Sequence, residues 1–490
     1  MPGKKKIQKK PPKKEIEATV LSSKKGENAL ERSSKLHLLL RPHIIFVILA
    51  FVFGTGILIT TPPFQVADEI AHFDRAYKLS EFSTFQKTEN NVSGDYVPSN
   101  IDSAFMMFRY LSWRPTVKVE KEKIYEAFNI PLEKNNKKFV GIDAGPYFYL
   151  SYIPQYPAIY LGKIFNLNVL AILYIGRFFG LLFYILCVWY AIKIIPTAKY
   201  LLMTVALMPM CLAQAGSYNA DCVLFSFSFL AIALLLKITF EKKKFSFNRK
   251  SVLLFLILVS LGILKPVYMP IAFSALILPK IIFKNNWRYF AITFSVIAMA
   301  CLLTFLWLKS NSLYLDYSDP NTDAQEKMKY LFNHPFFPIK IANETFGYFK
   351  DMHYYQTIGV LGYLDTKLPG WVYASFTIVI GILTLFESDK KHRLFIYQRV
   401  IFLFIAVMVF FMIISTLFLT NHRGNGLIVF GIQGRYFIPI IFPLLLAFHG
   451  LIPFRLNLSR RTIPALLLVL ILIIALTGTQ LALIDRYYNS

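Results

Sequence analysis

A cluster of polar side chains follows directly on the first strongly apolar stretch of the sequence, which ends at residues 61–63. The segment DEIAHFDRAY supplies two adjacent carboxylates, Asp68 and Glu69, then an imidazole at His72 and a guanidinium at Arg75. A partly desolvated carboxylate near an arginine can serve as a general base. Carboxylates and imidazoles also suit a divalent cation, so Asp68, Glu69 and His72 are possible metal ligands. The cluster suggests chemistry on a membrane-borne substrate.

The spacing of these residues leaves two interpretations open. If residues 66–80 form a helix, Asp68, His72 and Arg75 share one face at i, i+4 and i+7, with Glu69 on the adjacent strip. The plainer interpretation is a charged helix start at the membrane surface, in which Asp68 pairs with His72 or Arg75. Whether the cluster is a site therefore depends on which other side chains lie near it.

Further polar residues occur in or beside other apolar stretches. An ionisable residue in a membrane span is costly and indicates a function, although each one alone can equally be a snorkelling or interhelical residue. In the predicted topology they all map to the outer half of the membrane or to its outer surface, where arginine or lysine would suit a phosphate anion. The loop 359–370 (GVLGYLDTKLPG) is either a turn or a segment that closes over the site. The candidates are Arg177, Asn219, Asp221, Lys265, Tyr363, Asp365, Lys367, His422, Arg423, Arg435 and Tyr436.

The elements that must position these residues are membrane helices. The chain has 490 residues, is 56% hydrophobic and has a mean hydropathy of +0.49, and many apolar runs reach the roughly 17–25 residues that span a bilayer. The sequence predicts an all-α polytopic bundle of eleven spans. These lie near 43–61, 169–193, 199–215, 219–237, 251–265, 267–283, 288–308, 371–387, 398–420, 435–453 and 463–484.

The net charge of +25 has its source in one tail and in short loops. Residues 1–41 hold 12 Lys/Arg against 4 Glu, and the other basic clusters fall in loops on one side of the predicted spans. This is the positive-inside pattern. We therefore expect no nucleic-acid partner. We expect a disordered, basic cytoplasmic tail over residues 1–42, and a multi-pass cell-membrane protein with a cytoplasmic N-terminus and an extracytoplasmic C-terminus.

Two long extracytoplasmic loops follow from this topology, near 62–146 and 309–370. Residues 146–165 are aromatic and apolar but contain three prolines, which kink or break helices. An interfacial or re-entrant helix fits them better than a full span. We find no internal repeat, which disfavours transporter folds built from inverted repeats.

Several stretches resemble one known family. PPFQVADEIAHFDRAY is similar to the opening motif of a bacterial family of polytopic membrane proteins of unknown function. PYFYLSYIPQYPAIYLG, SYNADCVLFSFSFL, GVLGYLDTKLPGWVY and QGRYFIPIIFP resemble further segments of that family in the same order. The resemblance covers roughly residues 43–450 and leaves out the basic tail.

The family is grouped with the GT-C glycosyltransferases, which are multi-span enzymes that use a polyprenyl-phosphate-linked sugar on the extracytoplasmic side. The resemblance implies a GT-C-like transmembrane domain over residues 43–490, with Asp68 as the catalytic base. It implies that Glu69 positions the metal or the acceptor. Arg435 and Tyr436 match the family's Arg-Tyr pair, for which a lipid phosphate is a plausible ligand. The expected substrate-binding set also includes His72, Arg75, Arg177, Asp221, Lys265 and Asp365.

Our first hypothesis is therefore an inverting transfer of a sugar from a polyprenyl-phosphate donor to a cell-envelope glycan. Asp68 would accept the proton of the acceptor hydroxyl, and Arg435, with Lys265 or a divalent cation, would stabilise the departing phosphate. No other cofactor is expected. The alternatives are a lipid-linked glycan flippase or exporter and a non-catalytic scaffold for envelope assembly. The sequence leaves open the sugar, the acceptor and a monophosphate or diphosphate donor.

Overall fold

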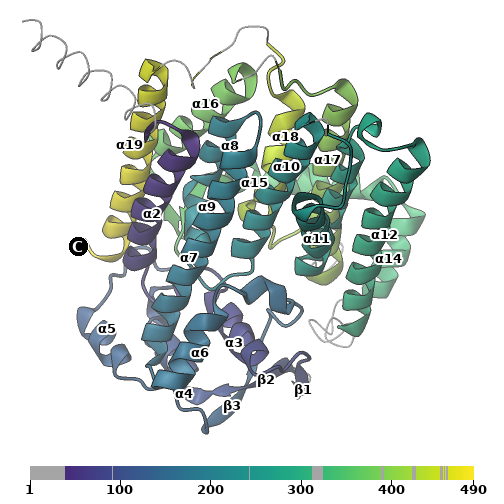
Figure 1. The fold of residues 1–490 in the computed structure, drawn as a ribbon. Coiled ribbons are helices and arrows are strands. Elements are labelled where there is room, and N and C mark those ends of the chain that lie inside the picture. The colour runs from purple at the N-terminus through teal and green to yellow at the C-terminus, as the bar shows by residue number, and fades with distance from the viewer. Residues whose placement is uncertain are drawn as a thin grey trace, which may run out of the picture.

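The computed structural model describes residues 39–489, apart from 91, 242, 312–323, 388–390, 422–425, 453–455, 457 and 459–461. Most of the predicted basic tail, together with His422 and Arg423, lies outside the described residues. The described part of the chain is mostly helical. Long helices form one bundle, and a smaller domain of short helices and strands lies at one end of it (Figure 1).

Six of the described helices are long and apolar enough to cross a membrane. Each contains an 18-residue stretch that is apolar on average and holds at most two charged residues, and this length is close to what crosses the hydrocarbon core. The chain is therefore a helical membrane protein, while the count of eleven spans stays a prediction. The six are α2 (Pro42–Thr60), α7 (Val169–Ile194), α10 (Asp221–Glu241), α12 (Asn286–Ser310), α17 (Ile396–Asn421) and α19 (Thr462–Tyr487).

The remaining bundle segments are shorter, and prolines account for several of their ends. Pro209 starts a new helix, so the predicted span 199–215 is two short helices. The predicted span 267–283 contains a 3₁₀ helix with Pro270 inside it. These segments are α8 (Lys199–Ala206), α9 (Pro209–Ala215), α11 (Arg249–Leu264), η3 (Pro266–Ile277), η4 (Lys280–Ile282), α16 (Gly370–Phe386), η5 (Gly434–Phe437) and α18 (Ile438–Phe448).

The bundle is organised around α7 and α10. Helix α7 packs against both α2 and α10, while α10 also contacts α9, α11, η3 and α18. Helix α10 is the most enclosed of the six long helices, since 78% of its apolar 18-residue stretch is buried. Helix α12 is the least enclosed, at 28%, so most of its surface faces outward. Polar residues at the start of α10 therefore sit at one end of the bundle's interior.

The first predicted outer loop, 62–146, is a folded domain. A three-stranded antiparallel sheet in the order β1-β2-β3 pairs Thr88 with Ser93 and Tyr96 with Phe139. A second hydrophobic core, around Phe73 and Tyr152, lies between α3, the sheet and the start of α7. The elements are α3 (Glu69–Ser80), β1 (Lys87–Glu89), β2 (Val92–Pro98), α4 (Ser99–Met106), η1 (Arg109–Leu111), α5 (Lys121–Phe128) and β3 (Lys137–Gly141).

The predicted interfacial segment 146–165 continues this domain as two short helices, η2 (Tyr149–Tyr152) and α6 (Tyr156–Phe165). Pro157 lies in the first turn of α6, where a missing N–H costs no helical hydrogen bond. With ten residues, α6 is about 15 Å long and too short to cross a bilayer.

The second predicted loop, 309–370, also holds regular structure. Helix α14 (Ala324–Asn333) and the longer α15 (Phe337–Gly359) lead into a hairpin of β4 (Val360–Leu361) and β5 (Thr366–Lys367). Gly362 and Leu364 have positive φ angles in the turn of this hairpin. Helix α15 packs against α9, α17 and η5.

Candidate functional site

Asp68 lies at the junction between the bundle and the folded domain of residues 62–146, which we call the outer domain after its predicted position. The prolines at 62 and 63 cannot continue α2, and the chain turns before α3 begins at Glu69. Asp68 itself takes the left-handed conformation, with φ 66° and ψ 4°, which a non-glycine residue adopts at a cost. The predicted helix over 66–80 therefore starts at 69. Since Asp68 is outside the helix, the expected face shared by Asp68, His72 and Arg75 does not form.

The carboxylate of Asp68 pairs instead with Arg435, from the short helix η5. Arg435 donates from Nη1 to Gln214 Oε1 at 2.8 Å, and its Nε lies 3.5 Å from Asp221 Oδ2. The Arg435 side chain is only 3% exposed, whereas that of Asp68 is 49% exposed. A buried guanidinium therefore holds an accessible carboxylate at the surface.

Lys265 completes this group from the end of α11. Its Nζ lies 3.8 Å from Asp221 Oδ1 and 4.0 Å from the ring centroid of Tyr436. Tyr436 is held by the hydroxyl of Tyr268, which donates to the Tyr436 carbonyl at 2.7 Å. The Lys265 side chain is 19% exposed and is thus the more accessible of the two cations. We call Asp68, Asp221, Lys265 and Arg435 the charged cluster.

His72 borders the charged cluster from α3. Its Nδ1 lies 2.7 Å from the hydroxyl of Tyr152, and its ring lies 5.0 Å from that of Tyr147. Burial lowers the pKa of His72 to about 4, although the charge of Asp68 opposes this shift. The imidazole is therefore neutral at neutral pH, and the Tyr152 hydroxyl can donate to it.

The pKa of Asp68 reflects two opposing effects. Burial of the carboxyl among the surrounding groups would raise the pKa, but the charge and hydrogen bond of Arg435, with smaller contributions from His72 and Lys265, hold it below its usual value. Asp68 is therefore ionised at neutral pH. It can accept a proton more readily if Arg435 turns to another anion.

Glu69 does not join this group. Both of its oxygens accept hydrogen bonds from Arg177, one of them from Nε at 2.8 Å, and Oε1 also accepts from the backbone N–H of Tyr218 at 3.1 Å. Both side chains of this pair are fully buried. Arg177 donates further to the carbonyl oxygens of residues 58, 61 and 62, where α2 ends. The pair thus ties the end of α2 and the start of α3 to α7 and to the segment that precedes α10.

Two other candidates also serve to join elements. Arg75 donates to the carbonyl oxygens of Tyr147 and Thr84, at 2.9–3.2 Å. Asp365 accepts from Arg486 at 2.8 Å, and Arg486 also donates to two carbonyl oxygens of the outer domain. Arg75 therefore positions the segment that carries Tyr147. Asp365 fastens the β4–β5 hairpin to the end of α19.

The structure adds residues that the sequence did not single out. Gln214 accepts from Arg435 and from Asn219 Nδ2, at 2.8 and 2.6 Å, and so links α9 to the charged cluster. Tyr147 and Tyr152 surround His72. The only signal for Gln214 was an amide inside a predicted span. Tyr147 and Tyr152 belong to a tyrosine-rich segment in which no single residue stood out.

Among the described residues, no group of three or more His, Cys, Asp or Glu side chains could hold a metal ion. The expected ligand set of Asp68, Glu69 and His72 is divided, because Glu69 is saturated by Arg177 and Tyr218. The charged cluster itself contains two carboxylates and two cations. A divalent cation there would have to compete with Arg435 and Lys265.

Fold and site together define a helical membrane protein with a charged cluster where its bundle meets a folded surface domain. The chain belongs to the family described as "Predicted membrane protein (DUF2142)", whose model matches residues 51–445. This span contains every residue of the charged cluster. We found no curated protein and no solved structure that matches the chain.

Proposed function

We propose that this protein is an inverting GT-C-type glycosyltransferase that moves a sugar from a polyprenyl-phosphate donor to a cell-envelope glycan on the extracytoplasmic face. One observation carries the proposal: the half-exposed carboxylate of Asp68 lies on the buried guanidinium of Arg435, at the edge of a membrane bundle. A base for a hydroxyl group and cations for a phosphate are the two parts that this reaction needs.

In the proposed step, the oxygen of the acceptor hydroxyl attacks the anomeric carbon of the sugar. The bond from that carbon to the phosphate oxygen breaks, and the lipid phosphate leaves with the electron pair. Asp68 takes the hydroxyl proton. The phosphate lies beside Lys265, the more exposed cation.

The charges of the cluster support this assignment. Its two carboxylates, Asp68 and Asp221, balance Arg435 and Lys265, while His72 is neutral because its pKa is about 4. When Asp68 accepts a proton, the cluster gains one net positive charge. That charge arises as the phosphate becomes more negative, so the two changes stabilise each other.

Donor binding also gives Asp68 its basicity. In the free protein Arg435 holds the pKa of Asp68 low, although burial opposes this. A phosphate that competes for Arg435 weakens the ion pair, and the pKa of Asp68 rises accordingly. Asp68 then becomes a better base only when a donor is present.

The proposed topology has eleven crossings. Contacts between the ends of segments support this topology. The backbone N–H groups of Tyr200 and Leu201 donate to Glu387, so the start of α8 and the end of α16 lie at the same end of the bundle. At the opposite end of the bundle, the backbone N–H of Val119 in the outer domain donates to the carbonyl oxygen of Tyr487 at the end of α19. These contacts support a topology in which the outer domain and the end of α19 share one side of the membrane, which the charge pattern predicts to be the extracytoplasmic side.

The test is a composition and linkage analysis of surface glycans. A strain that lacks the gene is complemented with the wild type, with Asp68→Asn or with Asp143→Asn, which changes an exposed carboxylate elsewhere in the outer domain. We expect deletion and Asp68→Asn to lose the same sugar substituent, and Asp143→Asn to keep it. Normal glycan with Asp68→Asn at wild-type membrane levels would refute the proposal. Loss of an entire polymer on deletion, but not with Asp68→Asn, would favour export or scaffolding.

A further inference from the structure

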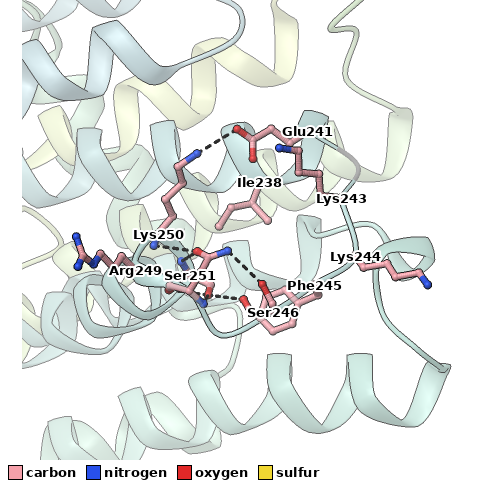
Figure 2. A pocket seen from close by; sticks show the side chains of 10 residues that line it. Ile238, Glu241, Lys243, Lys244, Phe245, Ser246, Arg249, Lys250 and Ser251 are labelled. Carbon is pink, nitrogen blue, oxygen red and sulfur yellow. Dashed lines mark hydrogen bonds and ion pairs between the residues drawn. The ribbon is translucent and has the colours of Figure 1, made fainter.

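A basic hollow lies at the end of the bundle opposite the charged cluster. Helix α10 starts with Asp221 in that cluster and ends at Glu241, about 30 Å further on. There, between the end of α10 and the start of α11, is a cavity of about 420 Å³ (Figure 2). Its lining residues are Ile238, Glu241, Lys243, Lys244, Phe245, Ser246, Asn248, Arg249, Lys250 and Ser251.

Positive charge in this hollow exceeds negative charge. Among the described residues of the lining, Glu241 is the only carboxylate, and it pairs with Lys250 at 3.1 Å and with Lys237 at 3.2 Å. Lys243, Lys244 and Arg249 form no ion pair with any described residue. Figure 2 shows Lys243 directed toward Glu241, with Lys244 and Arg249 extending to either side. The hollow therefore favours an anion.

An apolar groove begins beside the hollow. Its volume is about 530 Å³, and it runs between α11 and α12. Ser295 is its one polar lining residue, and its hydroxyl donates to the Ala291 carbonyl at 2.6 Å. The lining residues are Phe247, Val252, Phe255, Leu256, Val259, Ala291, Ile292, Ser295, Val296, Met299 and Leu303. No lining side chain offers an unpaired polar group, so the groove suits a hydrocarbon chain.

The hollow and the groove meet at three aromatic rings. Phe245 lines the hollow and Phe247 lines the groove, with ring centroids 5.5 Å apart. Both rings pack on Phe255, at 6.0 and 6.5 Å. Along α11 the charged lining changes to apolar lining between Ser251 and Val252. A ligand with a charged head and an apolar tail could occupy both spaces at once.

The length of the groove indicates which ligand this is. On α12 the lining extends from Ala291 to Leu303, a rise of about 18 Å. This is close to the roughly 15 Å depth of one hydrocarbon leaflet. Helix α12 is also the long helix with the least buried surface, so the groove opens toward the lipid. An acyl chain of a membrane lipid matches both features.

We propose that the hollow and the groove together bind one anionic phospholipid, with its headgroup in the hollow that Lys243, Lys244 and Arg249 line and an acyl chain between α11 and α12. Basic pockets at helix ends recognise anionic headgroups in this way. The site is separate from the charged cluster, and the inference does not depend on the proposed transferase activity.

The test measures lipid retention by native mass spectrometry. Full-length protein is purified with equal amounts of phosphatidylglycerol and phosphatidylcholine. The wild type is compared with a triple Lys243→Gln, Lys244→Gln, Arg249→Gln variant. A control triple variant carries Lys121→Gln, Lys329→Gln and Lys350→Gln at exposed positions elsewhere. We expect wild type and control to prefer phosphatidylglycerol by about tenfold or more, and the site variant to lose that preference.

Two further arms separate the lipid from a free anion. Ser295→Trp fills the groove without changing a charge, and it should lower retention of phosphatidylglycerol although the hollow is intact. Excess inorganic phosphate should leave the wild-type complex in place. Unchanged preference in the site variant, equal retention of phosphatidylcholine by the wild type, or complete displacement by phosphate would overturn the proposal.

Discussion

Asp68 and Glu69 are neighbours in the sequence, yet they lie in opposite environments. Glu69 is fully buried and holds a fully buried arginine, with both oxygens engaged. Asp68 is half-exposed and rests on an arginine that it shares with Asp221 and Gln214. One pair is closed to solvent and joins helices. The other is open to solvent, and in the proposed function it exchanges its partner for a substrate.

A third carboxylate of the same segment extends the comparison. Asp74, on α3, is buried with one oxygen that has no hydrogen-bond partner. Burial raises its pKa well above the usual value, with a further contribution from Asp102. One short segment thus contains an open ion pair, a closed ion pair and a carboxyl whose pKa is raised by burial. Three acidic residues of similar chemistry acquire different roles from what surrounds them.

Breaking the closed pair should have the largest effect. Glu69→Gln leaves the Arg177 charge buried with no counter-charge, which costs about 3–5 kcal/mol. We expect most of this variant to be lost from the membrane. The remainder should have a melting temperature far below that of the wild type. The measurement is the yield and thermal stability of detergent-solubilised protein. If Glu69→Gln had the yield and the melting temperature of the wild type, the pair would not hold the bundle together.

Breaking the open pair should leave the fold intact. Asp68→Asn keeps the side-chain volume, and Arg435 retains Asp221 and Gln214. We expect a melting temperature close to that of the wild type and a loss of turnover of about 10²–10⁴-fold, the usual contribution of a general base. Glycan modification and melting are measured on the same preparations. A variant that unfolds as Glu69→Gln does would remove the distinction between the two pairs.

Lys265 tests the phosphate side of the open cluster. Lys265→Gln removes the more exposed cation, and a lost charge-assisted contact of about 1.5–3 kcal/mol should raise the KM for the donor by roughly 10- to 100-fold. Lys265→Arg keeps the charge and should recover most of the affinity. Donor titrations with both variants provide the comparison. Equal KM values for wild type and Lys265→Gln would place the phosphate elsewhere.

Substitution of Asp74 should have the smallest effect on the melting temperature, and this effect should depend on pH. Its raised pKa means that the folded protein keeps a proton which the unfolded chain releases above about pH 4. Its contribution to stability therefore falls as pH rises through the folded pKa. Asp74→Asn should increase the melting temperature slightly at pH 8, and the gain should shrink at pH 5. A gain independent of pH would contradict a protonated Asp74.

The sequence predicted the elements better than their contacts. Hydropathy and charge indicated a helical membrane protein, and the apolar runs at 43–61 and 169–193 coincide with α2 and α7. The helix that was considered over residues 66–80 does form, but it starts at Glu69. Local spacing could not predict the left-handed turn at Asp68, which separates two carboxylates that were expected in one site.

The ion pairs themselves join residues far apart in the chain. Asp68 and Arg435 are separated by 367 positions, and Glu69 and Arg177 by 108. Hydrophobic periodicity specifies which residues form helices but not which distant side chains meet. Folded structure within the predicted loops was also missed, because the strands and helices of 62–146 carry mixed charge and no long apolar run.

The most direct test of the central claim is the binding of polyprenyl monophosphate to purified wild type, Asp68→Asn and Lys265→Gln. If Asp68 competes with the lipid phosphate for Arg435, Asp68→Asn binds this lipid at least as tightly as the wild type although its turnover is lower by about 10²–10⁴-fold, and Lys265→Gln binds it more weakly. If Asp68→Asn weakens binding as much as Lys265→Gln does, Asp68 is part of the lipid site and not a base that the phosphate releases.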